Sequence, residues 1–315
     1  MRALSPLLLL SLCACAASGL TAFRSHAWKG ALDADHPLVG VVWDVKAGVA
    51  LDGPELDARL GAARFVMLGE KHDNPDHHTL QGALVRRIVL QGRKPVLVFE
   101  MIAEDRQDEI AAASVASGWD PAAVAEASQW ADSGWPPFAE YRPIFEAASE
   151  AGLSLVAAGL PRREAMALAR GTKELEADVQ ARHALGSPLP EPLSSSLNQD
   201  LVASHCGYLT EETVAPMARV QRARDARMAD AMLAAEGPAV LIAGGEHARP
   251  DRGVPWYIRR HSPEVTLAVR FIEVDAEKPK PTDYAERNSG GFDIFVFTPR
   301  LRDIDYCAEL KAKGF

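Results

Sequence analysis

The stretch FVMLGEKHDNPDHH, residues 65–78, is decisive for the fold of this chain. Its first four residues are apolar and predict a buried strand that ends at a glycine. Three histidines and three carboxylates follow within nine positions. Asn74-Pro75 supplies a helix cap and a first-turn proline, so a helix is expected to start there. A buried strand that leads through a polar turn into a helix is typical of an α/β sheet.

The same alternation continues along the chain. Apolar runs predict six further strands, and the middle runs are continuously apolar, as expected of strands covered on both faces. These runs are residues 39–45, 95–101, 153–160, 239–246, 265–274 and 293–299. Helical patterns lie between them, so the sequence predicts an α/β fold with a mostly parallel central sheet flanked by helices. We expect a helical insertion between about residues 161 and 238.

The composition is that of a globular protein. The chain has 315 residues, of which 48% are hydrophobic and 24% charged, and this is enough for a sizeable core. The formal net charge of −9 does not support nucleic-acid binding, which needs a basic face. We therefore expect no nucleic-acid partner.

The first residues resemble an export signal. Arg2 precedes a short apolar run that ends in small residues, which is typical of a secretory signal peptide and too short to span a bilayer. The box LCAC resembles a lipoprotein cleavage site with Cys15 as the lipidated residue, and simple cleavage near Cys15 is the alternative. We expect a cell-envelope lipoprotein, anchored in the outer membrane of a Gram-negative host and facing the periplasm. Its segments would be a signal peptide over 1–14, a lipid-anchored tether over 15–37 and a folded domain over 38–315.

Two cysteines, Cys206 and Cys307, remain in the predicted domain. They could form a disulfide in an oxidising periplasm or remain two buried thiols, because their separation in space cannot be read from the sequence. The chain has no C-x-x-C pair, so neither a thiolate zinc site nor covalently attached haem is supported.

Three predicted strand ends carry groups that can do chemistry. Two G-x-x-H motifs, ending at His72 and His247, each follow an apolar strand, and each glycine is expected to permit a tight exit from its strand. Glu100 ends a third apolar run. Ligands bind at the carboxyl edge of open parallel sheets, so we expect these three residues and Glu70 to converge. Positions 70 and 247 are 177 residues apart (247 − 70 = 177).

Two imidazoles and two carboxylates can hold a divalent metal, or they can position and deprotonate a water molecule. A carboxylate beside a histidine fixes its tautomer and raises its basicity. One interpretation is therefore a metal- or water-activating hydrolase. Its catalytic or metal-binding residues would be Glu70, His72, Glu100 and His247.

A later helical run, QRARDARMAD, places Gln221, Arg224 and Asp225 at spacings of three and four residues. Arg224 or Asp225 could reach the predicted site from the insertion. A plain helix surface with salt bridges is the other interpretation.

Several motifs, in order, carry a resemblance to a known family: LGEKHDNPDHH, FEM, YRPIFEAASEAGLSLVAAGLPR, SHCGYL, QRARDARMADAM and AGGEHARPDRGVPWYI. Over about residues 38 to 275 the chain resembles the ChaN-type haem-binding lipoproteins of bacteria. These share a superfamily with the Tiki/TraB proteases and the erythromycin esterases. The resemblance implies an iron-regulated envelope lipoprotein for haem uptake, which binds haem non-covalently at a homodimer interface. It also implies that hydrolase relatives use the G-x-x-H motifs and the glutamates for chemistry.

The resemblance further implies that a tyrosine ligates the haem iron and that histidine and basic residues contact the propionates. Tyr141 and Tyr208 are both candidates for the ligand, and an aromatic residue that only packs against the fold is the more common interpretation of each. His72, His247 and Arg162 are the candidates for the other contacts with haem. We prefer a haem-binding protein to an enzyme, and a divalent metal in place of haem stays open.

Overall fold

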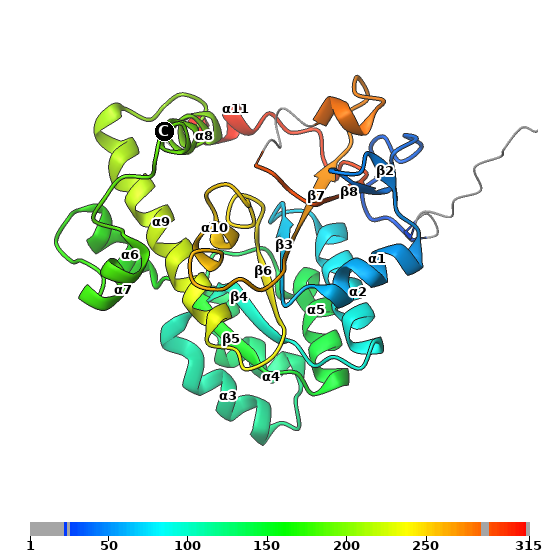
Figure 1. Cartoon of the computed structure of the whole chain (residues 1–315), viewed down its shortest axis with the longest axis horizontal. Coiled ribbons are helices and arrows are strands. Elements are labelled where there is room, and N and C mark those ends of the chain that lie inside the picture. Colours follow the sequence, from blue (N-terminus) through cyan, green and yellow to red (C-terminus); the bar gives the residue numbers. More distant parts are fainter. Residues whose placement is uncertain (1–21, 24–25, 285–289, 313–315) are drawn as a thin grey trace, which may run out of the picture.

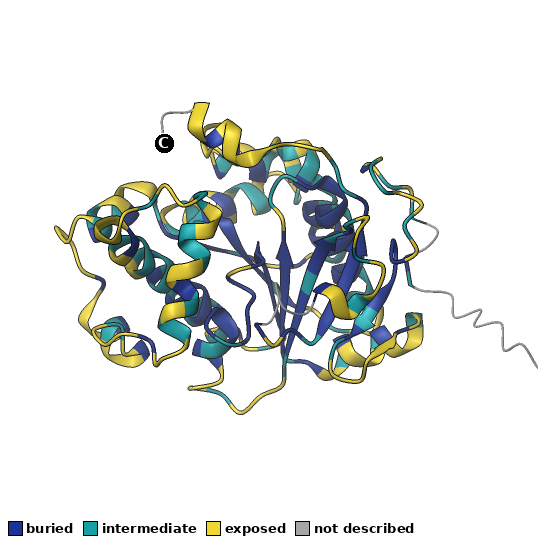
Figure 2. Cartoon of the chain, turned by 90° about the horizontal axis from the view of Figure 1, so that it is seen from above, coloured by how far each residue is buried: buried dark blue, intermediate teal, exposed yellow. Residues whose placement is uncertain are grey.

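The computed structural model describes residues 22–23, 26–284 and 290–312. The predicted signal peptide and Cys15 lie outside these residues, so export and lipidation stay predictions. Figure 1 shows a central sheet with helices on both sides of it. In Figure 2 the buried residues concentrate in the sheet and on the inner faces of the helices.

Eight strands form one sheet in the order β2-β1-β8-β7-β3-β6-β4-β5. Their bounds are β1 Val42–Asp44, β2 Val49–Ala50, β3 Phe65–Glu70, β4 Val96–Ala103, β5 Leu155–Gly159, β6 Ala239–Gly244, β7 Thr266–Glu273 and β8 Ile294–Thr298. The strands from β3 to β8 pair in parallel, whereas β1 pairs antiparallel with β2 and β8. The predicted α/β fold with a mostly parallel sheet is confirmed, and the sequence missed the short β2.

The helices have the following bounds: α1 Gly53–Ala62, α2 Pro75–Leu90, α3 Gln107–Ala116, α4 Pro121–Ala127, α5 Phe138–Ala151, α6 Arg162–Ala169, α7 Ala177–His183, α8 Leu193–Ser204, α9 Glu211–Leu233, α10 Val254–Ile258 and α11 Tyr306–Ala312. Short 3-10 turns lie at η1 Glu104–Arg106, η2 Trp130–Asp132 and η3 Pro281–Tyr284.

The central strands are buried on both faces because their side chains alternate between two cores. In β3, Val66 and Leu68 face a core shared with α2 and α5, while Phe65 and Met67 face a core shared with α9 and α10. This explains why the middle runs of the sequence are continuously apolar rather than alternating.

Helix α2 begins as its sequence predicts. The Asn74 side chain accepts a hydrogen bond from the Asp76 amide, and Pro75 occupies the first turn. Leu80, Leu84 and Ile88 then recur on one face and are buried against the sheet. The cap fixes where α2 begins. It thereby holds the polar turn between β3 and α2 at the edge of the sheet.

The helical insertion is confirmed as α6, α7, α8 and α9, between β5 and β6. Helix α9 contacts β4, β5 and β6 and also packs against α6 and α8, so it connects the insertion to the sheet. A disulfide between Cys206 and Cys307 joins the α8–α9 turn to α11, which settles the pairing that the sequence left open.

The segment before the predicted domain packs on it. The amides of Lys29 and Gly30 donate to the Asp76 carboxylate at 2.9 and 2.8 Å, and Leu32 forms a β-bridge with Arg300. This part of the predicted tether therefore belongs to the folded domain, which begins earlier than residue 38. Among the described helices, none is long and apolar enough to cross a membrane.

Candidate functional site

The carboxyl ends of β3, β6 and β4 are neighbours in the sheet, and they bring the four predicted residues into one cluster. His72 Nε2 lies 4.0 Å from Glu100 Oε2, and His247 Nε2 lies 3.2 Å from Glu100 Oε1. Glu70, the last residue of β3, lies 2.9 Å from His72 Nδ1. The expected convergence of Glu70, His72, Glu100 and His247 is therefore present.

Glu100 reaches this cluster through an irregularity in β4. The strand does not end at Glu100 as predicted but continues to Ala103, and its register with β5 shifts after Phe99. A side chain at Gly159 would collide with the backbone of this bulge, so glycine is needed there. Glu100 Oε2 accepts a hydrogen bond of 2.8 Å from the Gly244 amide, which holds the carboxylate at the end of β6.

The group around His72 is held by a buried carboxylate. Glu70 Oε1 accepts a hydrogen bond of 2.5 Å from the Tyr141 hydroxyl, and Glu70 Oε2 lies 3.4 Å from His78 Nε2. Burial alone would raise the pKa of Glu70, but His78 and His72 outweigh it and hold that pKa below its usual range. Glu70 is therefore a fixed anion. The His72 side chain, 35% exposed, is the part of this group that solvent can reach.

The group around His247 is a buried charged pair. His247 Nδ1 lies 2.6 Å from Asp225 Oδ1, and the Gln221 amide nitrogen lies 3.2 Å from the ring. Burial alone would lower the pKa of His247, but Glu100 and Asp225 raise it to about 10. Burial would likewise raise the pKa of Glu100, but His247 lowers it to about 2. The arrangement therefore favours an imidazolium between carboxylates.

Carboxylates and imidazoles alternate through the whole cluster. Glu70, His72, Glu100, His247 and Asp225 follow one another with separations of 2.9, 4.0, 3.2 and 2.6 Å. Such a series can hold a proton at several places and can orient a water molecule. Within the described ranges no three His, Cys, Asp or Glu side chains are arranged to hold a metal ion. The divalent-metal site predicted at Glu70, His72, Glu100 and His247 stays a prediction.

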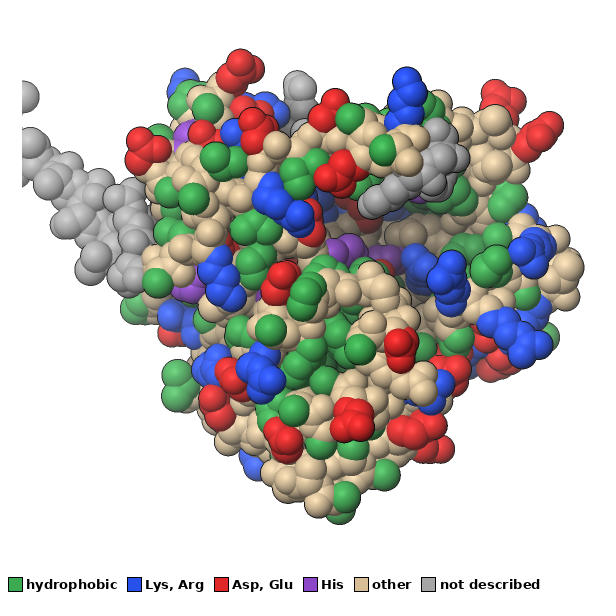
Figure 3. All heavy atoms as spheres, turned by 180° about the vertical axis from the view of Figure 1, so that it is seen from behind, with side chains coloured by type: hydrophobic (Ala, Val, Ile, Leu, Met, Phe, Trp, Pro, Cys, Tyr) green, Lys and Arg blue, Asp and Glu red, His purple; other side chains and the backbone are tan. Residues whose placement is uncertain are grey.

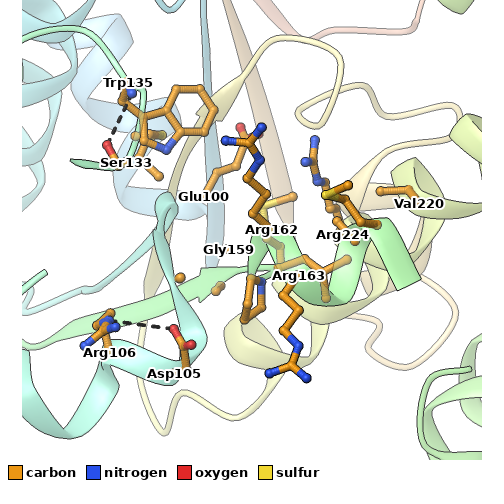
Figure 4. Close-up of a pocket in the computed structure, with 18 of the residues that line it drawn as sticks. Glu100, Asp105, Arg106, Ser133, Trp135, Gly159, Arg162, Arg163, Val220 and Arg224 are labelled. Carbon is orange, nitrogen blue, oxygen red and sulfur yellow. Dashed lines mark hydrogen bonds and ion pairs between the residues drawn. The ribbon is translucent and has the colours of Figure 1, made fainter. Parts of the chain in front are cut away.

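A cavity of about 790 Å³ opens beside Glu100 and Trp135 (Figure 4). In Figure 3 a hollow shows histidine side chains inside it and lysine or arginine side chains along its rim. Trp135 connects the cavity to the cluster, since its ring centroid lies 4.7 Å from that of His72. Apolar side chains line much of the cavity, among them Met101, Leu160, Met166, Met217, Val220 and Met228. Arg162, a predicted cofactor contact, also lines it.

The two candidate tyrosines lie in different surroundings. Tyr141 is fully buried and donates to Glu70, and burial together with the charge of Glu70 raises the pKa of Tyr141 far above its usual range. A phenolate ligand would have to form beside that carboxylate, so this environment opposes the ligand role predicted for Tyr141. Tyr208 is 42% exposed beside Cys206, outside the residues that line the cavity. Tyr306, which sequence reasoning passed over, is 57% exposed beside the other half of the disulfide.

A family model described as "Haem-binding uptake, Tiki superfamily, ChaN" matches residues 56–258, more than half of the chain. The chain belongs to this ChaN family. Among solved structures, ChaN of Campylobacter jejuni with cofacially bound haem is similar: 20% identity, a TM-score of 0.64, and coverage of 81% of this chain and 95% of that one. This likeness shows that the two share a fold.

An erythromycin esterase mutant in its open conformation is also similar, at 14% identity and a TM-score of 0.44, over 82% of this chain and 96% of that one. That likeness is too weak to support an argument. No curated protein matches the chain significantly.

Several members of the site escaped the sequence analysis of this ChaN-family chain. The sequence showed His78 only as one of three nearby histidines and gave no reason to place it beside Glu70. Nothing in the residues around Tyr141 predicted that its hydroxyl donates to Glu70. Trp135 lies in a loop without periodicity. The position of Asp225 could be anticipated, because the helical spacing placed it on the same face as Gln221. In the structure both side chains contact His247.

Proposed function

We propose that this protein binds haem non-covalently in the cavity beside Glu100. The observation that carries the proposal is the match to the haem-binding ChaN family over residues 56–258. The cavity of about 790 Å³ lies within the range of roughly 300–1,000 Å³ found for cofactor sites. Its methionine and leucine side chains suit a porphyrin face, and Arg162 suits a propionate.

We further propose an iron-regulated envelope lipoprotein, anchored through Cys15 and acting as a homodimer in haem uptake. The LCAC box and the family resemblance support this finer description. Tyr208 is the iron ligand we retain, because an exposed phenol on one protomer could complete a cavity on its partner. Phenolate ligation of ferric haem iron is known chemistry.

The test is an absorption titration of purified protein with ferric haem, repeated with Tyr208→Phe and Tyr306→Phe. We expect the Tyr208→Phe variant to lose the charge-transfer bands of a tyrosinate complex, because the ring remains and only the donor oxygen is removed. Tyr306→Phe is the matched control, since it removes a phenol beside the same disulfide. An unchanged spectrum in both variants would exclude these phenols as ligands.

Hydrolysis is a second candidate, favoured by the alternating carboxylates and imidazoles. His72, 35% exposed beside the cavity, could take a proton from water while Glu70 fixes its tautomer. A panel of nitrophenyl esters tests this candidate. If the chain is a hydrolase, turnover should fall about a hundredfold or more in His72→Ala; if the wild type turns over nothing, the candidate fails.

A further inference from the structure

Helix α8 lies at the cavity but is packed only lightly against the rest of the domain. Leu201 of α8 lines the cavity. Of the twelve residues of α8, all of which the structure describes, Leu197 alone is buried, whereas the neighbouring α9 buries seven. Figure 1 shows α8 at the outer end of the insertion, next to α11. Elements that bury little apolar surface open at a low cost in free energy, so the position of α8 depends on its other links.

One of these links is ionic. Asp200, the one charged residue of α8, meets two buried arginines of the loop between β6 and α10: its Oδ2 lies 3.2 Å from Arg249 Nη1 and accepts a hydrogen bond from Arg252. The side chain of Asp200 is 44% exposed. Arg249 also pairs with Asp251, and Arg252 with Glu246, so both arginines stay paired if Asp200 moves away. This link can therefore open without leaving a buried charge unpaired.

The other link is covalent. Cys206, just beyond the end of α8, is bonded to Cys307 in α11. Arg300, shortly before Cys307, is held by Asp33 at 2.7 Å, so the disulfide ties α8 to a fixed part of the domain. Cys307 is exposed and Cys206 partly exposed, and a reductant in solution can therefore reach the bond. Since α8 and the described part of α11 each bury a single residue, breaking this bond should leave the rest of the domain folded.

We propose that α8 is a lid on the cavity and that the exposed disulfide locks this lid shut. A thiolate of a dithiol reductant attacks Cys307 Sγ, the S–S bond breaks, and Cys206 leaves as a thiolate. The second thiol of the reductant then displaces Cys307. Both cysteines end as thiols, which take up the two thiol protons of the reductant, and the reductant ends as a disulfide. The ion pairs of Asp200 then hold α8 without covalent support, and the lid opens.

The consequence of this opening rests on the proposed haem site, because the lid would govern how fast haem leaves the same cavity. The lid itself can be tested without haem, by hydrogen exchange of the full chain before and after reduction with dithiothreitol. We expect the amides of α8 to exchange about tenfold or more faster after reduction, while those of α2, which is packed against the sheet, keep their rate. The double variant Cys206→Ser with Cys307→Ser should match the reduced protein with or without dithiothreitol, which controls for direct effects of the reagent.

Two further measurements test the ionic link and the consequence for the cavity. Adding Asp200→Asn to the double serine variant should speed the exchange of α8 again, whereas Gln199→Asn, a change at an exposed neighbour on the same helix, should not. Haem transfer to apomyoglobin should be about tenfold or more faster from the double serine variant than from the oxidised wild type. This comparison needs no reductant, so the haem iron never meets a thiol reagent.

The outcomes separate the lid from the haem assignment. If α8 exchanges at the same rate in the oxidised, reduced and serine forms, or if α2 accelerates as much as α8, the lid is wrong whatever the protein binds. If α8 opens as expected but haem leaves both forms at one rate, the lid does not govern the cavity and the inference fails, while the haem assignment stands. If α8 opens but the wild type binds no haem, the lid stands and the haem assignment fails.

Discussion

The two G-x-x-H motifs begin alike and end in different surroundings. His72 is 35% exposed beside the cavity, with its Nδ1 held by Glu70. His247 is 5% exposed and has a carboxylate at each ring nitrogen, Asp225 on one side and Glu100 on the other. The same G-x-x-H spacing after the same kind of strand therefore gives one partly exposed histidine, which a ligand can contact, and one buried histidine, which is held between two carboxylates.

The difference comes from the elements that cover each motif. Glu70 is surrounded by His78 from α2 and Tyr141 from α5, which enclose the carboxylate but leave the imidazole of His72 open on one side. Helix α9 lies over the second motif and supplies Asp225 from the insertion. A motif of this kind thus positions a histidine, and the helices that pack over it decide what the histidine does.

The largest effect should come from removing the anchor of the first motif. Glu70→Ala leaves the Tyr141 hydroxyl and two histidines without a buried acceptor, so we expect a loss of about 3–5 kcal/mol in the free energy of unfolding. Urea denaturation measures it. The exposed Glu264→Ala is the control and should change stability by no more than about 0.5 kcal/mol. A Glu70→Ala protein as stable as this control would show that Glu70 does not anchor the group.

His247, in the second motif, should make the stability of the protein depend on pH. The pKa of His247 is raised from 6.5 to about 10 on folding, so its contribution is complete below pH 6.5 and is lost as the pH rises towards 10. We expect the stability difference between wild type and His247→Gln to shrink by roughly 2–4 kcal/mol over that window. Denaturation at a series of pH values measures this difference, and a constant difference would mean that His247 is not held as a cation.

A smaller effect distinguishes the two glycines. A Cβ at Gly69 would lie 2.7 Å from the Ala248 Cβ and 2.9 Å from the Gly245 backbone, whereas a Cβ at Gly244 would lie 2.6 Å from His72 Nε2, the end of a side chain. We expect Gly69→Ala to cost about 1–3 kcal/mol and Gly244→Ala less. Denaturation of both variants measures this. The loss of stability caused by Gly244→Ala should become smaller when His72 is also replaced by alanine, because the close contact is then removed. Equal losses of stability in Gly69→Ala and Gly244→Ala would contradict the expected difference between the two glycines.

The glycines also mark a limit of the sequence. We expected each to permit a tight exit from its strand, yet neither adopts a left-handed conformation, and both are needed because other atoms pack closely against them. The strand segments along the chain, the helical insertion and the meeting of strand ends could be predicted because each follows from local apolar patterns and from the behaviour of parallel sheets. Close packing between distant segments leaves no such pattern.

The same limit applies to the site. Glu70, His72, Glu100 and His247 could be predicted because they follow apolar strands. Trp135 was not predicted, and Tyr141 was named only as a candidate iron ligand, because their roles in the cluster arise only when α5 and its preceding loop fold back over β3. The extent of β4 beyond Glu100 was missed for a related reason, since a bulge depends on the neighbouring strand.

The most direct test of the account is ferric haem binding by wild type, His72→Ala and His247→Gln, followed through the Soret band. We predict a shifted Soret band in the wild type at one equivalent of haem. His72→Ala should bind about tenfold more weakly without abolishing the fold, because the His72 ring packs against Trp135, which lines the cavity. His247→Gln should affect stability more than affinity. The absence of any Soret shift in the wild type, or equal affinities of wild type and His72→Ala, would contradict the account.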